Sequence, residues 1–170
     1  MGDLFSPLRT GDRIGRPGAW VRRATIAAFC IVAALALANV FGQRPVTSQA
    51  QGPAARLRLS APETLRGGLF FQSRLDVRAL RAVDFPRIVL DEGWIEGMQV
   101  NSIEPVPESE TSRDGRVVLS YGELAAGDRL RVWLQFQVNP TNAGRRSYAV
   151  ELDDEAEPIA RIERTITVLP

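Results

Sequence analysis

The pattern of hydrophobic and polar positions divides the chain into two parts that differ in kind. From residue 24 to residue 41, eighteen consecutive residues carry no charge. A helix of that length spans about 27 Å at about 1.5 Å per residue, close to the ~30 Å hydrocarbon core of a bilayer. Residues 24–41 are therefore predicted to form one transmembrane helix whose partner is the lipid bilayer.

Arginines flank this hydrophobic segment unequally. Only Arg44 and Arg56 follow it within fifteen residues, whereas five arginines precede it, at positions 9, 13, 16, 22 and 23. Because positive charge is retained on the cytoplasmic side, residues 1–23 are predicted to be cytoplasmic, with a signal anchor holding the rest outside the cell membrane. A cleaved signal peptide is the alternative, since residues 36–38 and 48–50 both fit a small-residue cleavage site. Either outcome exports the C-terminal part.

After the hydrophobic segment the sequence first becomes polar and then alternates. Residues 42–53 are rich in Gly, Pro, Gln, Ser and Thr and are predicted to be a linker. Beyond residue 53 hydrophobic side chains recur at every second position, which is typical of half-buried strands. Eight strands are predicted on this basis, at residues 57–61, 71–80, 88–90, 98–103, 117–121, 130–138, 148–152 and 162–168.

This strand pattern predicts the fold class. Eight short strands over about 115 residues, several of them about 10–15 residues apart, favour a mainly β chain. We expect an N-terminal transmembrane helix followed by an antiparallel β-sandwich of immunoglobulin or fibronectin III type at residues 54–170. Residues 71–80 also place three apolar side chains four apart, as in a helix, but the flanking strands favour a strand.

The composition removes most catalytic chemistry from the exported part. The chain has no His and no Lys, and its one Cys, Cys30, lies in the hydrophobic segment. The usual general base, Schiff-base chemistry, a thiolate metal site and an internal disulfide are therefore missing. Residues 54–170 carry fifteen Arg against eighteen acids, which argues against nucleic-acid binding. We expect no cofactor and no enzymatic activity.

One strand presents a candidate binding surface. In residues 130–138 every second side chain is apolar, and the opposite face carries Arg131, Trp133, Gln135 and Gln137. Arg and Trp are over-represented at binding hot spots, so this stripe is predicted to bind a protein, unless the linker or a loop covers this side of the sheet. Arg74 and Arg78, on the second predicted strand, are expected to pair across strands with acids.

Two groups of acids are the other candidates. Asp91, Glu92 and Glu96 flank Trp94, an arrangement that receives a sugar or an arginine, unless the ring packs on the sandwich. Five acids within residues 151–157 offer oxygen ligands for Ca²⁺, although the spacing is that of a solvated turn and not of an EF-hand.

Three stretches resemble a known group of proteins. Residues 90–94 (LDEGW), 101–105 (NSIEP) and 135–140 (QFQVNP) are similar to segments of small single-pass membrane proteins from high-GC, actinobacteria-like genomes that carry an exported immunoglobulin-like domain. The resemblance covers most of residues 54–170. It implies a location and a fold, and it assigns no catalytic residues.

These observations favour a membrane-anchored interaction module. We expect the exported domain to bind another envelope or membrane protein. The alternative is binding of cell-wall carbohydrate through Trp94 or Trp133. A carboxylate enzyme would require two acids in a deep cleft, which a bare sandwich rarely has.

Overall fold

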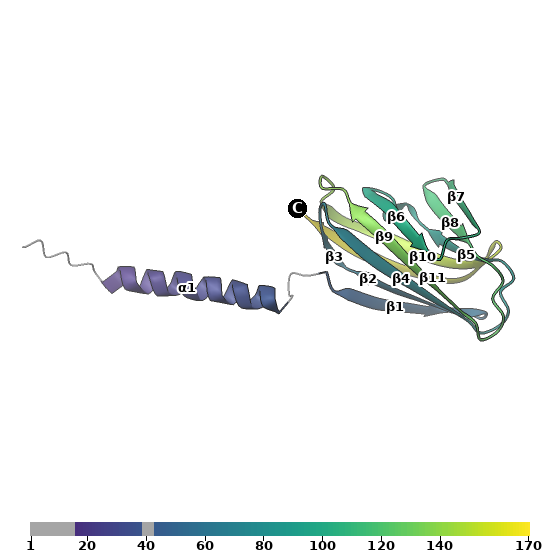
Figure 1. The fold of residues 1–170 in the computed structure, drawn as a ribbon, viewed down its shortest axis with the longest axis horizontal. Helices are drawn as coiled ribbons and strands as arrows, with labels where there is room; N and C mark the ends of the chain where they lie inside the picture. Colours follow the sequence, from purple (N-terminus) through teal and green to yellow (C-terminus); the bar gives the residue numbers. More distant parts are fainter. Residues whose placement is uncertain (1–15, 39–42) are drawn as a thin grey trace, which may run out of the picture. The chain divides into compact units, whose positions relative to one another are not determined.

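The computed structural model describes residues 16–38 and 43–170, in two compact units that divide after residue 42. In the first unit, helix α1 spans Arg16–Leu37 (Figure 1). Its stretch from Gly18 to Leu37 has a mean hydropathy of 1.7, long and apolar enough to cross a bilayer. The helix begins eight residues before the predicted segment, because arginine is a good helix former although it is charged. Residues 39–41 of the predicted span lie outside the described residues.

The second unit is a sandwich of two β-sheets (Figure 1). The five-stranded sheet has the order β1-β2-β4-β9-β6, formed by Pro45–Gln51, Ala55–Pro62, Phe70–Ala79, Arg129–Val138 and Met98–Glu104. The six-stranded sheet has the order β3-β11-β10-β5-β8-β7, formed by Thr64–Arg66, Glu157–Leu169, Gly144–Asp154, Pro86–Leu90, Arg116–Ser120 and Ser109–Arg113. A short 3-10 helix, η1, spans Glu92–Trp94. The prediction of a mainly β domain after an apolar helix is confirmed.

The core lies between the two sheets and follows the predicted alternation. On β9 the side chains of Val132, Leu134, Phe136 and Val138 are fully buried, as the sequence pattern indicates. Residues 70–79 form a strand and not a helix, since β4 pairs with both β2 and β9 along its length. On β4 and β9 the buried side chains alternate with side chains that face outward.

The prediction of an antiparallel sandwich is wrong for one pair of strands. Strand β3 pairs in parallel with the end of β11, with Thr64 opposite Thr167. The chain leaves β2 at Pro62 and continues in the same direction into the other sheet, where Thr167 N–H donates to the Glu63 carbonyl oxygen (2.8 Å). This crossing at the sandwich margin places the short β3 beside the C-terminal strand.

Three strands lie where no strand was predicted: β1, β3 and β7. The linker prediction for residues 42–53 is wrong over residues 45–51, which form β1 and pair with β2. From their polar composition, residues 106–115 are predicted to form a loop that the turn pair Asp114 and Gly115 closes. Residues 109–113 instead form β7, which makes a hairpin with β8 through that turn. Strands β1 and β7 are edge strands joined mainly by backbone hydrogen bonds, so their polar side chains carry no alternating signal.

Candidate partner-binding face

The four residues of the predicted stripe lie on the outer face of the five-stranded sheet. Arg131 and Gln135 are exposed, whereas Trp133 and Gln137 are half-buried among their neighbours. The alternative that a loop covers this face does not hold for the described residues, because two side chains of the stripe are open to solvent. The role of the stripe in binding stays a prediction.

The Trp133 ring contacts an arginine that is itself ion-paired. The Arg74 guanidinium carbon lies 5.4 Å from the centroid of the Trp133 ring. The carboxylate of Asp76 lies between Arg74 Nε (2.9 Å) and Arg131 Nε (2.6 Å); the Arg74 contact has the separation of an ion pair without hydrogen-bond geometry. A cation over an aromatic face is favourable, so Asp76 positions Arg74 against the ring and links Trp133 to Arg131.

At one end of the stripe the sheet surface forms a pocket of about 470 Å³, here called the arginine pocket. Strands β2, β4 and β9 line it with Arg56, Arg58, Arg74, Asp76, Val77, Arg78, Arg129 and Arg131. Of these six arginines, sequence reasoning placed only Arg131 in a binding surface, and it expected Arg74 and Arg78 to pair across strands with acids. Arg74 pairs with Asp76 of its own strand. Arg78 lies between Arg56 and Arg129 instead. Their alternation with buried residues was visible in the sequence, but the register that brings them together was not.

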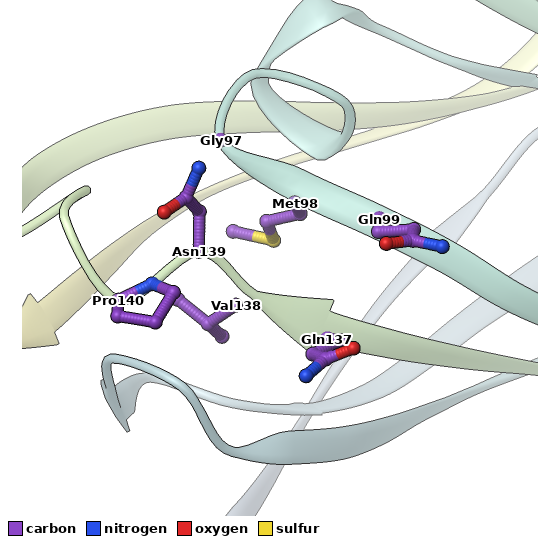
Figure 2. A pocket seen from close by; sticks show the side chains of 7 residues that line it. All are labelled: Gly97, Met98, Gln99, Gln137, Val138, Asn139 and Pro140. Carbon is purple, nitrogen blue, oxygen red and sulfur yellow. The ribbon is translucent and has the colours of Figure 1, made fainter.

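At the other end lies a second pocket, of about 370 Å³, here called the Gln137 pocket. Figure 2 shows Gln99 and Gln137 on the neighbouring strands β6 and β9, with Met98, Asn139 and Pro140 beyond them. Gln99 and Gln137 are direct cross-strand partners. The exposed ring of Phe70 lies opposite Gln137 on the other neighbouring strand, β4. The stripe therefore connects a basic pocket to an uncharged one across a single sheet face.

Trp94 is not a surface residue, and its predicted binding role is wrong. Its side chain is 2 % exposed, and its ring stacks on Phe136 (5.2 Å between centroids) and meets Tyr148 edge-on (4.6 Å). The indole Nε1–H donates to the Ala149 carbonyl oxygen at 2.8 Å. The ring thus closes one end of the hydrophobic core with its polar atom satisfied.

Backbone geometry explains why the chain buries this tryptophan. The Asp91 carboxylate accepts hydrogen bonds from Gly93 N (3.1 Å) and Ala149 N (2.8 Å), which holds η1 against β10. A Cβ atom on Gly93 would lie 2.2 Å from the Ser147 carbonyl oxygen, so only glycine permits this approach. The sequence LDEGW at residues 90–94 is therefore a packing motif.

The acids of residues 151–157 are dispersed by other contacts. Glu151 accepts hydrogen bonds from Arg116 (3.1 Å) and from Arg161, and Asp154 accepts one from Phe85 N (2.9 Å). Within residues 16–38 and 43–170, no group of three acidic, His or Cys side chains is placed to hold a metal ion. Burial raises the pKa of Asp153, and the neighbouring Glu151 raises it further, against the opposing Arg116 and Arg87.

Comparisons with known proteins show no family for this chain and give only distant matches among solved structures. No family model matches the sequence, and no curated protein matches it. Among solved structures, a non-cellulosomal cohesin from Archaeoglobus fulgidus is 14 % identical with a TM-score of 0.42, over 73 % of this chain and 91 % of that one. CaCohA2 from Clostridium acetobutylicum is 13 % identical with a TM-score of 0.42, over 73 % of this chain and 92 % of that one. A CARDB domain from Pyrococcus furiosus, in complex with di-metal ions, gives 13 % and 0.38, over 75 % and 90 %.

Proposed function

We propose that α1 anchors the protein in the cell membrane, with residues 1–23 in the cytoplasm and residues 43–170 outside. The support is the length and hydropathy of α1, the exposure of its apolar side chains, such as Phe29, and the arginines concentrated before its apolar part. Exposed apolar residues on every side of a helix require an apolar surrounding, which a bilayer supplies. The immunoglobulin or fibronectin III type of the sandwich belongs to the same proposal.

Strand β1 argues against one of the two candidate sites for signal-peptide cleavage. Residues 48–50 lie inside β1, with Ser48 opposite Leu59 and Ala50 opposite Leu57, so cleavage there would remove most of a paired strand. Cleavage after residue 38 would leave β1 whole. The intact mass of the membrane-extracted protein distinguishes an uncleaved anchor from a chain that starts at residue 39.

The function that the geometry supports best is binding of another envelope or membrane protein through the outer face of the five-stranded sheet. One observation carries it: the half-buried Trp133 lies on an open sheet face between a pocket with six arginines and an uncharged pocket. Protein interfaces are enriched in Trp and Arg, with hydrogen-bonding groups around a central anchor. We infer a binding role and not catalysis.

The alternative of carbohydrate binding depends on Trp94 and Trp133, and the structure argues against a sugar stacking on either ring. Trp94 is buried in the core, and the Arg74 guanidinium already lies over the ring of Trp133. A sugar that stacks on Trp133 from that side would have to displace Arg74 from both the ring and Asp76.

Photo-crosslinking in membranes tests the proposed function. Because the chain has no lysine, amine-reactive crosslinkers are unsuitable, and a photoreactive residue at Gln72, the cross-strand neighbour of Gln135, reports on the face directly. We expect one envelope or membrane protein to crosslink, and the Trp133→Ala variant to lose it. Phe85→Ala, which removes an exposed ring outside this face, is the matched control. Absence of a specific adduct, or its persistence with Trp133→Ala, contradicts the proposal.

A further inference from the structure

Strand register brings like charges into line across the arginine pocket. Arg78 of β4 is the direct cross-strand neighbour of both Arg56 on β2 and Arg129 on β9. Like charges directly opposite each other lower the stability of a sheet. This row of three arginines therefore opposes folding, and its presence calls for a reason other than stability.

The acid within the pocket does not neutralise this row. Asp76, one row along the sheet, is shared by Arg74 and Arg131. Arg78 and Arg129 make no ion pair and no side-chain hydrogen bond to any described residue. The pocket thus has six arginines and one aspartate among its lining residues.

The two arginines of β2 make their side-chain hydrogen bonds to neutral groups, although Arg58 also lies opposite Asp76 in the strand register. Arg56 donates to the Gln51 side-chain oxygen (2.7 Å), and Arg58 donates to that of Gln49 (3.5 Å), both on the edge strand β1. Glutamine amides orient the guanidinium groups without cancelling their charge. The outer face therefore orients Arg56 and Arg58 through neutral amides and leaves four of its six arginines, at positions 56, 58, 78 and 129, without an ion pair to a described residue.

Several arginines of the six-stranded sheet, by contrast, form ion pairs with acids. Glu151 takes both Arg116 and Arg161, and Glu63 takes Arg164. Residues 43–170 as a whole carry sixteen arginines against eighteen acids, so the domain has enough acid to pair them. Arg66, Arg81 and Arg145 also make no ion pair with a described residue. The arginine pocket differs from these positions because three of its arginines lie directly opposite one another across neighbouring strands.

We propose that the arginine pocket binds an extended acidic segment of the partner protein, an assignment that rests on the proposed function. The guanidinium group binds a carboxylate through two parallel hydrogen bonds. Alternate side chains of a strand are about 6.8 Å apart, so Arg56 and Arg58 on β2, like Arg129 and Arg131 on β9, match carboxylates on alternate residues of an extended chain. Trp133 and the glutamines beside the pocket extend the surface in the manner of a protein interface.

The test uses the full-length protein in nanodiscs of neutral lipid and a fluorescent peptide of alternating Glu and Ser. We expect saturable binding by anisotropy that weakens as ionic strength rises, and no binding of the matching Gln–Ser peptide. The double variant Arg78→Gln and Arg129→Gln should bind the acidic peptide at least about tenfold more weakly. Its melting temperature should stay equal or rise, because the repulsive row is removed.

The matched control is the double variant Arg66→Gln and Arg81→Gln, which removes two exposed arginines outside the pocket. It should bind the peptide as the wild type does; an equal loss in both double variants would show non-specific attraction and overturn the assignment. Binding of phosphatidylserine vesicles or single-stranded DNA in place of the acidic peptide overturns it as well. If the pocket variant still crosslinks the partner through Gln72, the acidic assignment fails while the proposed function stands. No partner for the wild type means that the proposed function itself fails.

Discussion

Replacement of Trp94 by alanine tests whether this residue is part of the core or of a surface. The ring is 2 % exposed, contacts Phe136 and Tyr148, and donates one hydrogen bond to Ala149. Large-to-small substitution of a buried aromatic residue costs about 3–5 kcal/mol. Since domains of this size are stable by about 5–15 kcal/mol, Trp94→Ala should remove a large part of the free energy of unfolding.

Urea denaturation followed by far-UV circular dichroism measures this loss. Residues 43–170 are the suitable fragment, because every buried residue of the core lies between Ala55 and Val168. Trp94→Phe should cost less, since it keeps a ring between Phe136 and Tyr148 and loses the hydrogen bond and part of the volume.

Trp133→Ala is the control, because that ring is half-buried on the outer face. Its cost should stay below about 1 kcal/mol, while its effect on partner binding should be large. A loss for Trp94→Ala that is no greater than the loss for Trp133→Ala would refute the reasoning.

Three further substitutions test individual buried groups. The guanidinium of Arg164 donates hydrogen bonds to the Val46 carbonyl oxygen of β1 (2.9 Å) and to the Glu63 carboxylate (3.0 Å). Arg164→Met should therefore speed amide hydrogen exchange in β1 and leave the exchange in β10 unchanged. An equal change of the exchange rates in β1 and β10 would contradict this prediction. The Tyr148 hydroxyl is buried without a hydrogen-bond partner among the described residues, and burial raises its pKa to about 12, so Tyr148→Phe should raise stability by about 1 kcal/mol in urea titrations. Because burial raises the folded-state pKa of Asp153 above 3.8, its contribution is present below that pH and is lost as pH rises through the folded value. Asp153→Asn should therefore be more stable than wild type at pH 7 and similar to it below pH 3.8; equal stability at both pH values would refute the shift.

The sequence predicted the parts of the fold that depend on burial. The inward face of β9 and the strand at residues 70–79 follow from the alternation of hydrophobic and polar residues. The turn at Asp114 and Gly115 follows from the Asp-Gly pair, because these residue types tolerate the positive φ angles of 52° and 73° found there. Strand β1 was not predicted, because its residues are polar or small and none of them is fully buried, so no alternation could be detected. Trp94 was misplaced because its burial depends on a distant contact, the approach of Gly93 to Ser147.

Only part of the candidate site could be predicted from the sequence, because the rest depends on how distant strands pair. The polar face of β9 could be predicted from one strand alone, which is why Arg131, Trp133, Gln135 and Gln137 were found together. The arginine pocket depends on the register of three strands that are far apart in sequence, so that Arg56, Arg78 and Arg129 meet only after folding. A row of like charges lowers stability wherever it occurs. The other face of the same sheet packs a well-formed core, so the sheet does not need this row of arginines in order to fold. The row therefore supports our proposal that the outer face binds a partner.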